Sequence, residues 1–110
     1  MSNIPSDGSS PVEIISANDQ GIGLDDGLLQ WIAPWSTISQ ITVALVPHRA
    51  SSLLVAAIGI DDERVVVAAE DQPLWPALME ALHRNLPDVE PMAIWETRAR
   101  KGESVNVIYP

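Results

Sequence analysis

The chain of 110 residues has no cysteine, no phenylalanine and a single tyrosine. Without cysteine it can form no disulfide, no thiolate metal site and no thiol nucleophile. Without phenylalanine, aliphatic side chains must fill most of the core, and the four tryptophans become unusually prominent. A chain of this length is expected to form one domain around one core.

Basic residues are scarce: the net charge is −9, and the first basic residue is Arg49. Such an acidic chain repels phosphate backbones and anionic membranes, so we expect neither nucleic acid nor membrane as a partner. The one basic concentration is the segment ETRARK at residues 96–101. It is either a helix end whose charges complement the helix dipole or a small patch for nucleic acid or another partner.

Long apolar runs are also absent. The most apolar stretch, ASSLLVAAIGI at residues 50–60, is too short to span a bilayer. The N-terminus lacks the basic and apolar regions of a secretory signal, which favours a cytoplasmic location. Residues 1–10 are rich in Ser, Asp, Gly and Pro, so we expect a flexible leader followed by a single domain over residues 11–110.

Short apolar runs separated by turn residues occupy the first 70 positions, a pattern typical of strands. Asp26-Gly27 favours a hairpin turn, and Pro34 cannot continue a central strand. The acidic segment at residues 61–63 joins two further runs as a hairpin. The predicted strands cover residues 12–16, 22–24, 28–33, 39–46, 52–60 and 64–70.

The apolar spacing then changes to three and four, which indicates one face of a helix from residue 73 or 74 to residue 87. Pro76 is tolerated in its first turn and Pro87 ends it. A second helix over residues 91–101 and a strand over 103–109 follow. This order predicts an α+β fold: a bent antiparallel β-sandwich, or partly open barrel, of six to seven strands. The first helix would cap it, and the second short helix and a closing strand would follow.

Several motifs share their spacing with a known group of domains. They are Asp26-Gly27, Trp35-Ser36-Thr37-Ile38, Ile41, Val43, Trp75, Leu78, Leu82, Trp95, Val107 and Tyr109. In these motifs the chain resembles uncharacterised bacterial domains with a pleckstrin-homology-like fold, over residues 12–109. The resemblance implies a binding module. Lipid-binding members use basic residues in the first hairpin loop, whereas the loops ANDQG and DDG here are acidic or neutral, so we expect no phosphoinositide partner.

The four tryptophans divide into core and candidate contact residues. Trp35 is predicted to pack into a corner after Pro34, and Trp75 belongs to the apolar face of the first helix. Trp31 is either a core residue or exposed on a groove or interface, and Trp95 is expected to be half-buried. If a tryptophan anchors a partner, Trp31 and Trp95 are the candidates.

Catalytic and metal-binding patterns do not stand out. His48 falls in a loop and His83 lies beside the apolar stripe of a helix, neither at ligand spacing. The acidic groups Asp25-Asp26 and residues 61–63 fall at hairpin tips, where Asp is favoured for bonding the local backbone; acid–base work or calcium binding is the alternative. We therefore predict no catalytic, metal-binding or cofactor-binding residue and no cofactor.

Two functional hypotheses follow. The first is a non-catalytic binding or adaptor domain that recognises a protein or peptide, with charge complementarity favouring a basic partner. The second is a self-assembling domain, a homo-oligomer in which residues 52–60 form a sheet shared between copies. A small enzyme is a remote third possibility.

Overall fold

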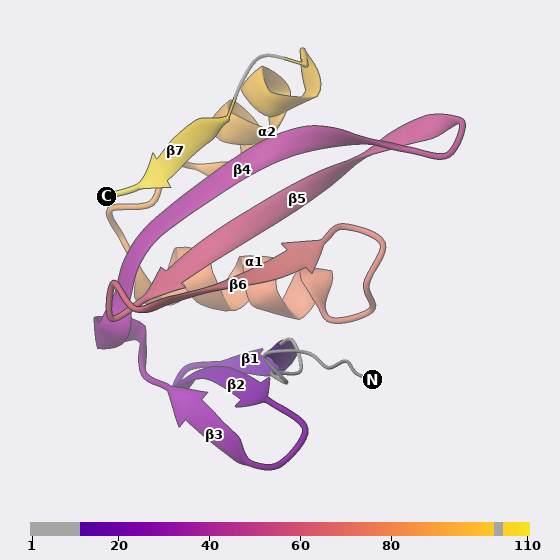
Figure 1. The fold of residues 1–110 in the computed structure, drawn as a ribbon. Helices are drawn as coiled ribbons and strands as arrows, with labels where there is room; N and C mark the ends of the chain where they lie inside the picture. The colour runs from indigo at the N-terminus through magenta and orange to yellow at the C-terminus, as the bar shows by residue number, and fades with distance from the viewer. Residues whose placement is uncertain (1–11, 103–104) are drawn as a thin grey trace, which may run out of the picture.

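A computed structural model describes residues 12–102 and 105–110. It contains seven strands in two antiparallel sheets together with two α-helices, and neither sheet closes into a barrel in the described part of the chain (Figure 1). The predicted α+β class is confirmed. The predicted leader, residues 1–10, lies outside the described residues, as do residues 103 and 104 at the start of the predicted closing strand.

The N-terminal sheet has three strands in the order β1-β2-β3, and the second sheet has four in the order β6-β5-β4-β7. The small sheet consists of β1 (Glu13–Asn18), β2 (Gly21–Asp25) and β3 (Gln30–Ala33). The four-stranded sheet consists of β4 (Ile38–His48), β5 (Ser51–Ile60), β6 (Arg64–Ala69) and β7 (Asn106–Tyr109). All pairings are antiparallel. Short turns join the strands of every pair except β4 and β7, between which β5, β6 and both helices intervene.

Strand β5 is an interior strand, not an edge. It pairs with β4 over its whole length and with β6 from Val55 to Ile60. The expectation that residues 52–60 form a sheet shared between copies is therefore wrong for Val55–Ile60, where both edges of the strand are already paired. The turn after Ile60 folds β6 back along β5, and this local hairpin uses the backbone groups that a second chain would need.

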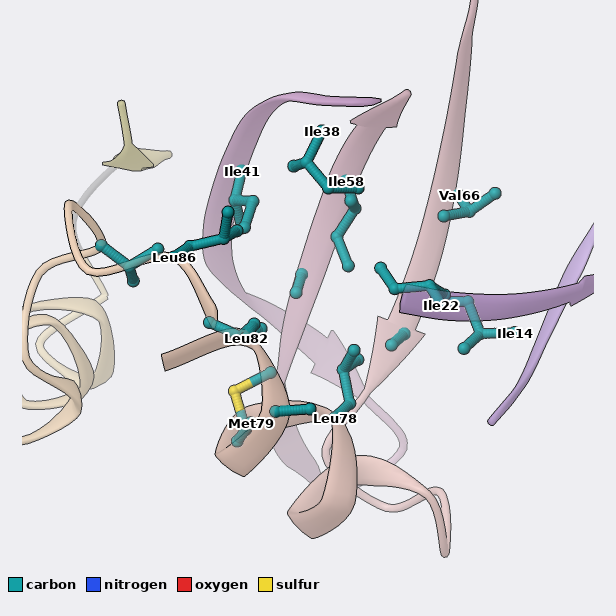
Figure 2. Close-up of a cluster of buried hydrophobic side chains, with 14 of the residues drawn as sticks. Ile14, Ile22, Ile38, Ile41, Ile58, Val66, Leu78, Met79, Leu82 and Leu86 are labelled. Carbon is teal, nitrogen blue, oxygen red and sulfur yellow. The ribbon is translucent and has the colours of Figure 1, made fainter. Parts of the chain in front are cut away.

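The helices lie close to their predicted positions, at Trp75–Asn85 for α1 and Met92–Arg100 for α2. Pro76 occupies the first turn of α1, where its missing N–H leaves no hydrogen bond broken. Leu78 and Leu82 point from α1 toward the strands (Figure 2), whereas Met79 lies toward α2. Because α1 also packs beside β1, one helix covers the apolar interior that the two sheets share.

The core alternates along the strands with period two. In β5, Leu54, Ala56, Ile58 and Ile60 are buried, whereas the residues between them are only half-buried. This alternation places one side of the four-stranded sheet against the helices, and the described residues leave the other side uncovered.

The corner between the two sheets is built around Trp35, which opens the 3₁₀ turn η1 (Trp35–Thr37). The indole is buried, and its N–H donates to the carbonyl oxygen of Asn18 at 2.7 Å. The hydroxyl of Thr37 donates to the carbonyl oxygen of Pro34 at 2.6 Å. The core positions predicted for Trp35 and Trp75 are both confirmed, with 7% of each residue exposed.

Gly21 fits this corner only because it lacks a side chain. Its φ is 148°, and a Cβ atom there would lie 2.1 Å from the carbonyl oxygen of Ala33. We expect Gly21→Ala to lower the free energy of unfolding by at least about 2 kcal/mol, since the clash is with backbone. Urea unfolding monitored by tryptophan fluorescence measures this.

Gly102→Ala is the matched control, because Gly102 also has a positive φ, 77°, but an added Cβ would meet nothing within 4 Å. It should cost only about 1 kcal/mol, the strain of the backbone conformation alone. Equal losses in the two variants would contradict the importance of the close approach.

Candidate protein-interaction surface

Trp31 lies on the inner side of β3, opposite Leu24, and is half-buried against the core. The guanidinium carbon of Arg64 sits 5.2 Å from the centre of its ring, a cation–π contact that covers part of the indole. Trp31 is therefore partly a core residue. Its role as a partner anchor stays a prediction.

Trp95 is fully buried, so the half-buried position predicted for it is wrong. Its indole N–H donates to Nε2 of His83 at 3.1 Å, and Nδ1 of His83 lies 2.6 Å from the carbonyl oxygen of Met79. Trp95 and Ala99, four residues apart, form the buried side of α2, a spacing that was visible in the sequence. A buried indole offers no surface to a partner, which removes Trp95 as a contact residue.

His83 accepts the indole hydrogen bond through Nε2, and its Nδ1–H then donates to Met79. We expect His83→Leu to lower the free energy of unfolding by about 1–3 kcal/mol, because the buried Trp95 N–H loses its acceptor. Urea unfolding at neutral pH measures the loss. His48→Leu, at an exposed position near the β4–β5 turn, is the control and should change stability little; equal effects would refute the role of the hydrogen bond.

The basic segment at the end of α2 is engaged within the chain. Arg98 pairs with Glu90 and donates to the amide oxygen of Asn106 at 2.8 Å. Arg100 pairs with Glu70 at 2.7 Å and with Glu96 at 2.9 Å. Both arginines lie in the last turn of α2, as the helix-end interpretation requires.

Glu70 connects α2 to the four-stranded sheet. Its carboxylate accepts hydrogen bonds from Arg100 and, at 2.7 Å, from the backbone N–H of Leu54. The Arg100 hydrogen bond is the larger cause that holds the pKa of Glu70 below its ordinary value of 4.5, and the Leu54 bond adds to it.

Because the folded-state pKa of Glu70 is lowered, the stability it contributes is present above pH 4.5 and is lost as the pH falls through the folded-state value. We expect Glu70→Gln to cost about 0.5–1 kcal/mol at pH 7, and the difference from wild type to shrink in acid. Urea unfolding at several pH values tests this. Glu13→Gln, at an exposed position of β1, removes one carboxylate in the same way and is the control; equal losses of stability at pH 7 in the two variants would contradict the assignment.

The acidic turns form local backbone structure. Asp26 Oδ1 accepts the N–H groups of Leu28 and Leu29, both at 2.8 Å, which lower its pKa. Asp61 and Asp62 adopt left-handed φ values of 56° and 59° in the β5–β6 turn. Within residues 12–102 and 105–110, no three His, Asp or Glu side chains gather as a metal site.

The side of the four-stranded sheet that the described residues leave uncovered, here called the open face, is an apolar surface that sequence reasoning missed. Both helices lie behind the sheet as drawn in Figure 1, and this side faces the viewer. Val65, Val67 and Val107 are 65%, 54% and 50% exposed. The open face consists of Ser39, Gln40, Thr42, Ala44, Val46, Leu53, Val55, Ala57, Gly59, Val65, Val67, Ala69 and Val107, and none of these residues is charged.

The strand register makes the open face continuous. Val67 pairs with Ala57, Ala57 with Thr42, and Thr42 with Val107, so one row crosses all four strands. Most of the side chains are small, so they project little from the sheet and the surface is flat. A hollow of about 480 Å³ lies at the end near the β5–β6 turn, and the charged residues 62–64 line it together with Gln40, Thr42 and Gly59 of the open face.

The β4–β5 hairpin extends the open face beyond the sheet. β6 stops pairing at Val55 and β7 at Val43, so residues 45–54 form a two-stranded ribbon, here called the arm, that projects in Figure 1. Val46 pairs with Leu53 on the same side as the open face. The arm ends at His48 and Arg49, which are exposed.

A second apolar surface is a groove of about 730 Å³ between α1 and the start of α2. Trp75 and Met79, which line it, are core side chains with 7% and 3% of their surface exposed. Glu80 also lines the groove. The rest of its lining is mostly apolar.

One sequence signal pointed to the open face. The run RVVVAA at residues 64–69 is apolar at consecutive positions, which indicates a strand that is apolar on both sides. Val66 and Ala68 enter the core, and Val65 and Val67 form the other side.

No helix in the described residues is both long enough and apolar enough to cross a bilayer.

Comparison of the chain with protein-family models, curated proteins and solved structures gives no match. The resemblance to pleckstrin-homology-like bacterial domains stays a prediction.

Proposed function

We propose that this protein is a non-catalytic protein-interaction domain of the cytoplasm whose binding surface is the open face with the arm. The observation that carries the proposal is an uncharged, valine-rich sheet face on a chain with 15 acidic residues and a net charge of −9. Large exposed apolar patches on an otherwise charged protein mark interaction sites. The pleckstrin-homology-like resemblance, which implies a binding module, agrees with this role.

A protein surface suits the open face better than the other partner classes. Nucleic acid and anionic lipid are repelled by the net charge of −9. The face offers apolar area with a few neutral hydrogen-bonding groups, Gln40 and Thr42 among them. The buried centre of a protein interface is likewise apolar and depleted in charge.

Val67→Lys tests the proposal, because Val67 lies midway along the edge strand β6 on the open face and is 54% exposed, so the fold tolerates a polar side chain there. Captured proteins, including untagged copies of the chain itself, are quantified from native lysate with wild type and variant as bait. We expect the specific partner to fall at least tenfold with Val67→Lys, since a lysine ammonium would be buried unpaired.

Ile94→Lys is the matched control, because Ile94 is 55% exposed on α2, away from the open face. It should capture as much partner as wild type. Equal recovery with Val67→Lys and Ile94→Lys would overturn the proposal. Trp31→Ala in the same experiment tests the tryptophan anchor separately.

A further inference from the structure

We propose that the partner of the open face is a second copy of this chain, packed face to face about a two-fold axis with the strands of the two sheets antiparallel. In this dimer the arm tip of each copy reaches the acidic β5–β6 turn of the other. The inference rests on the proposed function, since it uses the same surface, and it adds the identity and orientation of the partner.

Charge is the first argument for a second copy. Two chains of net charge −9 repel each other, so they can associate closely only through a surface that brings no like charges together. The open face has no charged side chain, whereas the turns after β2 and β5 carry Asp25, Asp26 and residues 61–63. Self-contact through this face therefore brings carboxylates to the margins of the interface and not to its centre: Asp62 and Glu63 border the hollow, and Glu13 lies beside Val65 and Val67.

Shape is the second argument. A two-fold interface must be self-complementary. Two flat sheet faces satisfy this condition when they pack about 10 Å apart, as in a β-sandwich. From the spacing of strands and residues, the face and arm cover about 450 Å² per copy. The pair then buries about 900 Å², below the standard range for stable complexes, so we expect a dimer with a micromolar dissociation constant.

The distribution of charge along the face sets the orientation. Asp61, Asp62 and Glu63 are exposed at one end, and His48 and Arg49 at the other. The ten residues of β5 separate these ends by about 33 Å. A parallel arrangement would place the acidic turns together, whereas the antiparallel one places Arg49 beside the acidic turn of the second copy.

Sedimentation equilibrium and light scattering of the full chain over micromolar to millimolar concentration test the dimer. Wild type should move from its monomer mass of 11.9 kDa toward twice that value. Val67→Lys should raise the dissociation constant at least tenfold, and Ile94→Lys should leave it unchanged. Circular dichroism verifies that both variants are folded.

A charge swap tests the orientation. Arg49→Glu and Glu63→Lys should each weaken the dimer several-fold, because Arg49→Glu places a carboxylate beside the acidic turn and Glu63→Lys lowers the charge of residues 61–63 from −3 to −1. In the double variant the arm-tip carboxylate faces a turn of charge −1 in place of −3, so the dimer should be tighter than with Arg49→Glu alone. Double-variant affinity no better than that of Arg49→Glu would overturn the antiparallel orientation.

The remaining outcomes separate this inference from the proposed function. If the chain stays monomeric and Val67→Lys still abolishes capture of a different protein, the second-copy inference is overturned and the proposed function stands. If wild type dimerises and Val67→Lys dimerises equally well, the dimer uses another surface and the inference is overturned. If the chain is monomeric and capture is also unaffected, both fail.

Discussion

The apolar side of α1 is the element on which the rest of the structure depends. The two sheets are separate in hydrogen bonding, and they share an interior into which Leu78 and Leu82 project from α1 (Figure 2). Without phenylalanine, this interior is built almost wholly from aliphatic side chains and buried tryptophans. Burial of these side chains is the main stabilising contribution.

Because both helices lie on one side of the four-stranded sheet, its other side is exposed in the described part of the chain. α1 and α2 lie behind the four-stranded sheet, and the described residues provide no third layer in front of it (Figure 1). Sheets in globular proteins either expose polar residues on such a side or cover it. Here the side carries Val65, Val67 and Val107, so it is neither polar nor covered within the described chain. The proposed function accounts for this.

The polar contacts described above hold helices and strands in position. The Trp95–His83 hydrogen bond joins α2 to α1, and Glu70 joins α2 to the base of the arm. The arginines of the basic segment serve the same purpose. Their pairing shows why a cluster of basic residues in a short sequence is weak evidence for a nucleic-acid site: a chain rich in carboxylates provides intramolecular partners.

The sequence by itself determined the local structure: the strands, both helices and the corner at Trp35. These depend on short-range patterns, namely period-two alternation, three-and-four spacing, and the restrictions that Pro34 and Pro76 place on the backbone. Only the tertiary structure decided that β5 is interior, that Trp95 is buried and that the described residues leave one side of a sheet uncovered. Each of these depends on which elements pack together across long sequence separations. The local sequence pattern around a valine in a strand is the same whether its outward side contacts a helix or solvent.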